Sequence, residues 1–96
     1  MNNQFKKVKE NYFKRLEQFV PIVDRVHGSH HPEFHDVRRV FNNIGEKVKN
    51  TEGTDLKEEF LELRKITDNY KVPTDVCETY EAVYNMLEEL DKAYFE

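Results

Sequence analysis

The sequence predicts an all-α protein, an antiparallel bundle of four helices in up-down-up-down order. Charged residues make up 35% of the 96 residues, with only three glycines and three prolines, a composition typical of long helices. Apolar residues recur at steps of three and four along four stretches, which is the spacing of one helix face. Short links join the stretches and favour antiparallel neighbours. We expect one domain over residues 1–96.

The first predicted helix covers residues 3–27. Pro21 lies inside it, donates no backbone hydrogen bond and clashes with the preceding turn. The helix is therefore expected to kink at Pro21, or a second short helix to begin there. Gly28 ends it, because glycine adopts a left-handed conformation most easily. The predicted apolar face consists of Phe5, Val8, Tyr12, Leu16, Phe19, Val23 and Val26.

The second helix is predicted over residues 32–48, with Pro32 and Glu33 in its first turn. Residues 50–53 form the next turn. The third helix covers residues 55–70, with Asp55 and Glu58 at capping-box spacing and Thr54 as the other candidate cap. The apolar positions of the two helices are Phe34, Val37, Phe41, Ile44, Val48, and Leu56, Phe60, Leu63, Ile66 or Thr67, Tyr70.

The fourth helix is predicted over residues 75–95, with Thr74 as its cap. Its apolar positions are Val76, Tyr80, Val83, Leu87, Leu90 and Tyr94. In an antiparallel bundle, the end of the first helix and the start of the second share one pole with the end of the third and the start of the fourth. That pole collects His27, His30, His31, Glu33, His35, Asp68, Tyr70, Asp75, Cys77 and Tyr80.

The four histidines all fall within residues 27–35. His27 lies about 40° from the centre of its helix's apolar face and should point inward. A neutral imidazole there is a metal ligand, or a core histidine bonded to a carbonyl or a tyrosine. His35 lies about 150° from the next apolar face and should face solvent. The directions of His30 and His31 cannot be taken from periodicity, and the cluster is either a ligand set or a solvated turn.

Cys77 is the single cysteine. It suits a reducing cytosol, because no internal disulfide is available. In the first turn of a helix its thiol is either a reactive redox group or a small apolar filler. The tyrosines, including Tyr70 and Tyr80, are core residues with hydroxyls at the wet edge.

Several classes of function are excluded. Acids and bases are mixed along a chain of net charge −4, without the basic face that nucleic acid requires. No apolar run approaches the ~20 residues of a membrane span, and the N-terminus lacks an apolar signal core. No nucleophile–base constellation, phosphate loop or cysteine-pair motif is present, so enzymatic catalysis without a metal is unsupported.

Two segments resemble the hemerythrin-like di-iron proteins that repair stress-damaged iron–sulfur clusters, the RIC or ScdA type. The first is Asp24-Arg25-Val26-His27-Gly28 followed by His31-Pro32, and the second covers residues 72–90. Together they span about a third of the chain. The resemblance implies a hemerythrin-like bundle, non-haem iron and a role under nitrosative or oxidative stress.

The chain departs from that family at the iron ligands. The family binds iron through histidines from all four helices and paired His-x-x-x-Glu motifs. The third and fourth predicted helices contain no histidine, and the chain stops at Glu96, near where the last such motif would begin. Only His27 matches a ligand position, so a di-iron site within one chain is not expected.

Two functions follow, beside that of a redox sensor based on Cys77. The first is a small cytosolic RIC-like protein connected with iron–sulfur cluster repair, with an abbreviated site for iron or another divalent metal. Its ligands would be His27 and His31, with His30, His35 and Glu33 as helpers, and a homodimer joining two histidine poles could complete the set. The alternative is a protein-interaction module without metal, which docks a repair protein or a second copy through Tyr70, Cys77 and Tyr80.

Overall fold

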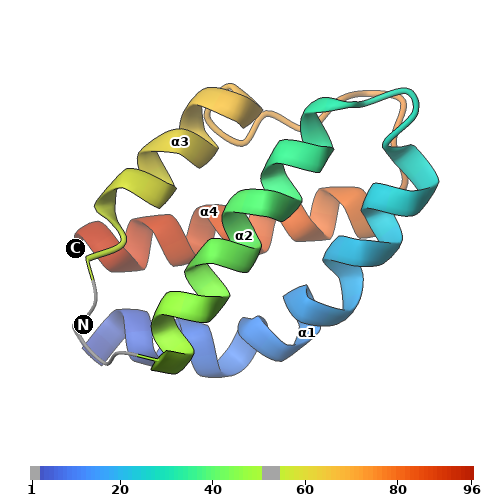
Figure 1. Ribbon diagram of the computed structural model, residues 1–96. Helices are drawn as coiled ribbons and strands as arrows, with labels where there is room; N and C mark the ends of the chain where they lie inside the picture. Colours follow the sequence, from blue (N-terminus) through green and yellow to red (C-terminus); the bar gives the residue numbers. More distant parts are fainter. Residues whose placement is uncertain (1–2, 51–54) are drawn as a thin grey trace.

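Four helices make up most of the computed structural model, which describes residues 3–50 and 55–96 (Figure 1). They are α1 (Asn3–His27), α2 (Glu33–Asn50), α3 (Lys57–Thr67) and α4 (Glu78–Phe95). α1 packs against α4 and α2, and α2 packs against α3. No strand occurs in the described residues, and the prediction of an all-α bundle of four helices is confirmed.

The core is apolar and rich in aromatic rings. Phe5 packs edge-on against Phe60 and Tyr94 at one end, whereas Phe34 packs against Tyr80 and Tyr84 at the other. Burying one such side chain contributes roughly 1.5–3 kcal/mol. The buried apolar residues are Phe5, Phe13, Leu16, Val20, Val23, Phe34, Val37, Val40, Phe41, Ile44, Leu56, Phe60, Leu63, Tyr70, Tyr80, Val83, Tyr84, Met86, Leu87, Leu90 and Ala93.

The predicted face of α1 is partly wrong. Val26 was assigned to the core, but its side chain is 58% exposed. Phe13 and Val20 are buried instead, and Phe13 packs against Phe41 of α2. Pro21 sits inside α1, and the helix continues through it to His27.

The ends of α3 and α4 also differ from the prediction. α3 stops at Thr67 because Asp68, Asn69 and Tyr70 all have left-handed backbones, with φ of 52°, 61° and 64°. α4 begins at Glu78, three residues later than expected, because Cys77 is extended and holds the N-cap position. Thr74 therefore does not cap it.

At the start of α3 the predicted capping box is replaced by a local bond. Leu56 holds the N-cap position without a side-chain cap, and the backbone N–H of Lys57 donates to the Asp55 carboxylate at 2.9 Å. Of the predicted turn over 50–53, Asn50 is the last residue of α2 instead, and residues 51–53 and the candidate cap Thr54 lie outside the described residues.

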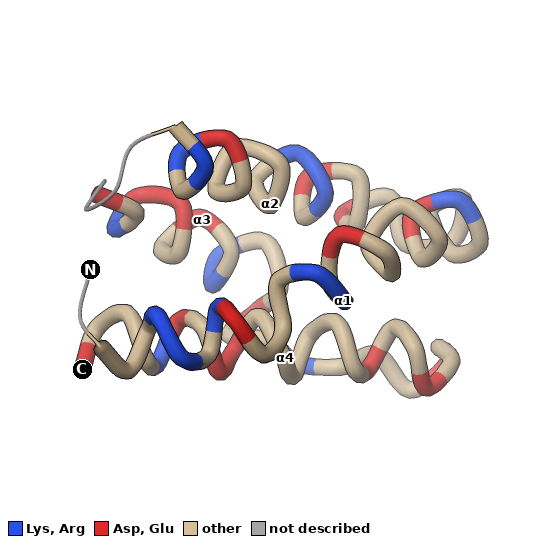
Figure 2. Tube along the Cα trace, turned by 90° about the horizontal axis from the view of Figure 1, so that it is seen from below, with Lys and Arg blue, Asp and Glu red and all other residues tan. Residues whose placement is uncertain are grey.

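The residues between α1 and α2 (28–32) and those between α3 and α4 (68–77, here called the α3–α4 link) lie at the same end of the bundle (Figure 1). Seen from below, α2 and α3 lie on one side, and α4 with the first half of α1 lies on the other (Figure 2). Within the described residues, none of the helices combines the length and the apolar character that a membrane crossing needs.

Candidate functional site at the histidine pole

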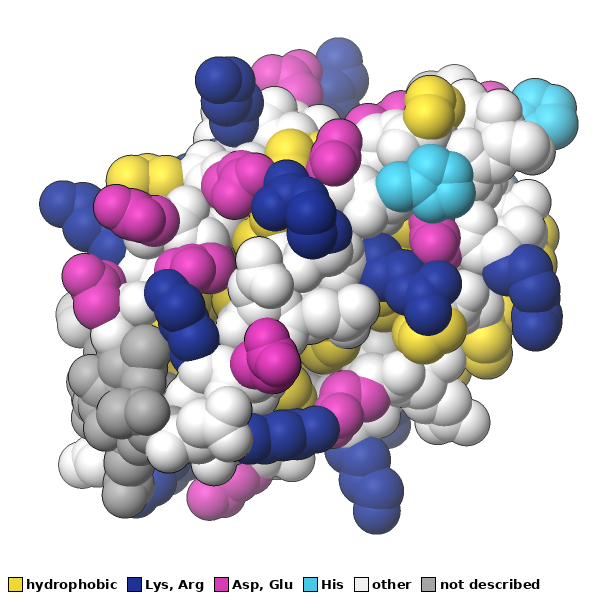
Figure 3. All heavy atoms as spheres, viewed as in Figure 1, with side chains coloured by type: hydrophobic (Ala, Val, Ile, Leu, Met, Phe, Trp, Pro, Cys, Tyr) yellow, Lys and Arg dark blue, Asp and Glu magenta, His cyan; other side chains and the backbone are white. Residues whose placement is uncertain are grey.

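The end where the two connections meet is here called the histidine pole, and it contains residues 27–35 and the α3–α4 link. Histidine side chains are exposed at this end (Figure 3). His31 joins the start of α2 to the α3–α4 link. Its Nδ1 lies 2.9 Å from Oε1 of Glu33 and its Nε2 lies 2.9 Å from Oδ1 of Asp75. A carboxylate only accepts hydrogen bonds, so both nitrogens donate when the imidazole is protonated.

The pKa of His31 is raised. Burial of the ring opposes protonation, but the hydrogen bonds and charges of Glu33 and Asp75 outweigh it. The side chain is only 15% exposed. The protonated ring therefore holds the α3–α4 link against the start of α2.

His27 points inward from the last turn of α1, as predicted. Its Nε2 lies 3.2 Å from Sγ of Cys77, and its ring stands edge-on to Tyr80 with centroids 5.4 Å apart. The His27–Cys77 contact is a second tie between α1 and the start of α4. Cys77 itself is exposed, and its proposed redox role stays a prediction.

His35 forms a third tie, in a place that the sequence did not indicate. As predicted, its side chain is largely exposed, but Nδ1 lies 2.5 Å from Oδ1 of Asp24. That contact is an ion pair when the ring is protonated, although its geometry is poor for a hydrogen bond. Oδ2 of Asp24 accepts from Arg38 at 3.0 Å. Asp24 follows Val20 by four residues on the buried face of α1, and that position could have identified it.

Gly28 is needed because the end of α1 and the His35 ring leave no room for a side chain, and not because its backbone is left-handed. This corrects the prediction. A Cβ at Gly28 would lie 2.4 Å from the carbonyl oxygen of Asp24 and 2.6 Å from Cε1 of His35. Both distances are well inside van der Waals contact. Glycine therefore lets the His35 ring lie directly over the end of α1.

The five predicted metal ligands are not gathered around one point. His31 faces Glu33 and Asp75, His27 faces Cys77, and His35 faces Asp24. The side chain of His30 is exposed, and its Nδ1 lies 3.2 Å from the hydroxyl of its neighbour Ser29. In residues 3–50 and 55–96, no group of three or more histidine, cysteine, aspartate or glutamate side chains is arranged to hold a metal ion. The described residues therefore do not fit a di-iron centre of the hemerythrin type.

Tyr70 and Tyr80 are core residues, which corrects their assignment to a contact surface. Tyr70 is 7% exposed and Tyr80 is fully buried. The Tyr70 hydroxyl donates to Oδ2 of Asp91 at 2.6 Å, and the Tyr80 hydroxyl lies 3.1 Å from that of Tyr84. Burial raises the pKa of Tyr70 and Tyr80. Their hydroxyls stay neutral and hold the core beneath the pole together.

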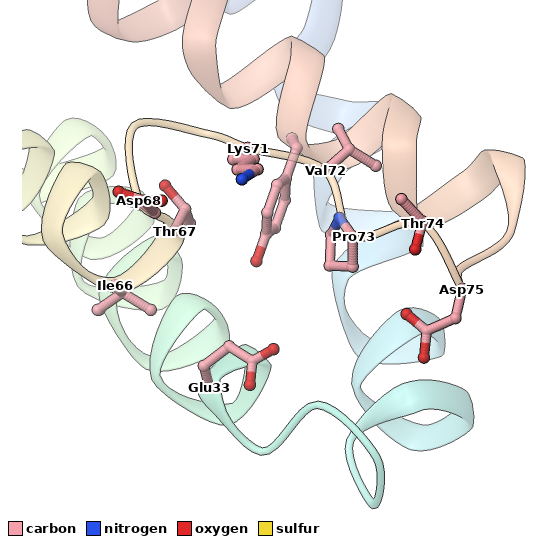
Figure 4. A pocket seen from close by; sticks show the side chains of 10 residues that line it. Glu33, Ile66, Thr67, Asp68, Lys71, Val72, Pro73, Thr74 and Asp75 are labelled. Carbon is pink, nitrogen blue, oxygen red and sulfur yellow. The ribbon is translucent and has the colours of Figure 1, made fainter.

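An open cleft of about 630 Å³ lies beside these ties, between the start of α2, the end of α3 and the α3–α4 link. Glu33 extends into it, and Asp68 and Asp75 stand at its two ends (Figure 4). Among the described residues, Lys71 is the only cation that lines it. The lining residues are Glu33, Ile66, Thr67, Asp68, Lys71, Val72, Pro73, Thr74, Asp75 and Tyr84. The cleft thus combines apolar walls with three carboxylates.

Comparisons of this chain with protein-family models, with curated proteins and with solved structures found no match.

Proposed function

We propose that this protein is a protein-interaction module that docks its partner in the cleft at the histidine pole. One observation carries the proposal. The imidazoles of the pole are engaged with carboxylates and a thiol, while the cleft next to them is open and partly apolar and carries three carboxylates, of which Glu33 and Asp75 are bonded to His31. Such a surface suits a segment with lysine or arginine side chains beside apolar ones.

The proposal includes a short hemerythrin-like bundle, with antiparallel neighbouring helices and a bend at Pro21. The meeting of both connections at one end supports the antiparallel order. Through its family resemblance, the proposed partner is a cytosolic protein that takes part in iron–sulfur cluster repair.

Capture of partners from cell extract tests the proposal when the wild-type protein is compared with variants of the cleft. Asp68→Asn removes a carboxylate from the cleft yet tolerates the left-handed backbone. Lys71→Glu replaces the one cation among its described lining residues with a carboxylate. A partner with a basic segment should be captured less by Asp68→Asn and more by Lys71→Glu. Lys65→Glu, an exposed change on α3 outside the cleft, is the matched control. Equal capture by all four proteins would refute docking in the cleft.

One observation favours a second function. His27 and Cys77 face each other at 3.2 Å, and imidazole and thiolate are both ligands of iron and zinc. The second candidate is therefore a RIC-like metal protein whose site needs ligands beyond this pair. Metal analysis after untagged aerobic and anaerobic purification tests it. It requires about one iron per chain in the native protein and loss of that iron in His27→Ala.

A further inference from the structure

A second cavity shares a wall with the cleft. It has a volume of about 380 Å³ and lies between the α3–α4 link and the start of α4. Residues 72–74, here called the strap, line both this cavity and the cleft. The side chains of Val72 and Pro73 point away from the chain in opposite directions (Figure 4). The other lining residues of the second cavity are Val76, Cys77, Glu78 and Glu81.

The strap is fixed at both ends and unbonded between them. Before it, the backbone N–H of Lys71 donates to the carbonyl oxygen of Thr67 at 3.0 Å. After it, Asp75 is bonded to His31 at 2.9 Å. In the part of the chain that the structure describes, the strap itself takes part in no hydrogen bond or ion pair. Segments with few backbone hydrogen bonds open at a low cost in free energy.

Movement of the strap exchanges space between the two cavities. Val72 and Pro73 are half-buried and Thr74 is exposed, so apolar contacts rather than hydrogen bonds hold the strap in place. Because its two ends are fixed, displacement of the strap toward one cavity widens the other. A molecule that fills one cavity therefore opposes the filling of the other, and this coupling is reciprocal.

We infer that the second cavity regulates the cleft. A group that fills the second cavity displaces the strap into the cleft and weakens the docking of the partner there. This inference rests on the proposed function, since docking in the cleft is the event that is regulated. Cys77 is exposed and lines the second cavity, so a group attached to its sulfur lies at the edge of that cavity.

Two uncharged adducts of Cys77, the single cysteine, test the coupling because they differ in size. N-phenylmaleimide adds the thiol across its double bond and leaves a bulky group. Methyl methanethiosulfonate transfers only a methylthio group to the sulfur and releases methanesulfinate. Both adducts replace the thiol hydrogen, so the contact with His27 is altered in both.

The docking probe is an end-blocked hexapeptide of alternating lysine and leucine, whose affinity for each form of the protein is measured by calorimetry. The bulky adduct should bind this peptide about tenfold more weakly than the unmodified protein, a typical size for coupling between sites. The methylthio adduct should bind it like the unmodified protein. The comparison of the two adducts thus separates filling of the cavity from loss of the thiol.

Backbone NMR tests the coupling without any peptide. Ile66 and Asp68 line the cleft but not the second cavity. Their amide signals should shift in the bulky adduct and keep their positions in the methylthio adduct. The signals of Phe5 and Phe60, which pack together at the other end of the core, should not move in either adduct, which verifies that the bundle stays intact.

Equal affinity of the two adducts for the peptide would overturn the inference, and so would unshifted signals of Ile66 and Asp68 in the bulky adduct. A peptide that does not bind the unmodified protein would instead count against the proposed function. The NMR comparison would then decide the coupling between the cavities by itself.

Discussion

At the scale of single residues, the histidines act as ties between elements. His31 joins the start of α2 to the α3–α4 link, His27 joins α1 to the start of α4, and His35 joins α2 back to α1. The ties of His31 and His27 give their ring nitrogens hydrogen-bond partners at the edge of the core, where an unmade bond would cost free energy. The same imidazoles that suggest a metal site in the sequence thus have structural partners.

His31→Gln should remove a pH-dependent part of the stability. The pKa of His31 is raised in the folded protein, so its stabilisation is complete below the ordinary histidine pKa of about 6.5 and is lost as pH rises through the raised value. Wild type should melt roughly 2–6 °C above His31→Gln at pH 6, and the gap should narrow at pH 9. His30→Gln, in the same turn, should match wild type at both pH values. A gap that stays constant with pH would contradict the protonated tie.

Two glycine substitutions should have opposite effects on stability. Gly28→Ala places a Cβ against the Asp24 carbonyl and the His35 ring, and should destabilise by roughly 1–3 kcal/mol. At Gly45 in α2 the nearest atom to a new Cβ is 3.7 Å away, on Phe13, so Gly45→Ala should stabilise by up to about 1 kcal/mol. Urea unfolding of both variants measures this difference, and equal effects would refute the steric role of Gly28.

At the scale of elements, the α3–α4 link is the least regular part of the pole and the most firmly anchored. Its first three residues have left-handed backbones, which cost roughly 1 kcal/mol each outside glycine. Tyr70 offsets this cost by reaching the Asp91 carboxylate, which also accepts a bidentate contact from Arg64. Asp91 is 2% exposed, so these bonds are shielded from water.

Tyr70→Phe should loosen the link. It removes the hydroxyl that donates to Asp91 and should lower the free energy of unfolding by roughly 1–3 kcal/mol. Tyr12→Phe is the matched control, because Tyr12 makes its bond to Glu89 near the surface, and its effect should stay within about 0.5 kcal/mol. Chemical denaturation of the two variants checks the contrast. Similar losses would show that Asp91 does not anchor the link.

The spacing of the apolar residues predicts the number of helices and most buried positions, because residues three and four apart lie on the same face of a helix. It does not predict where α3 ends, since Asp68, Asn69 and Tyr70 carry no glycine signal for a left-handed turn. It assigns Val26 to the core because spacing alone cannot decide which side of α1 meets its neighbours. The partners of the histidines, above all Asp24 and Asp75, depend on how the two connections meet in space.

At the scale of the whole molecule, the cleft and the histidine ties share one end of the bundle. The cleft lies between the start of α2, the end of α3 and the α3–α4 link. Our proposal thus depends on the imidazoles being structural ties. The functional feature of the pole is then the cleft and not a metal site.

The measurement that tests this claim most directly is nitrogen-15 NMR of the histidine rings before and after one equivalent of ferrous iron under anaerobic conditions. We predict that His31 shows two protonated, hydrogen-bonded ring nitrogens near neutral pH. The signals of His27, His31 and His35 should persist after iron is added, with only the exposed His30 affected. Simultaneous loss of the His27 and His31 signals at one equivalent of iron would contradict the account and establish a metal site.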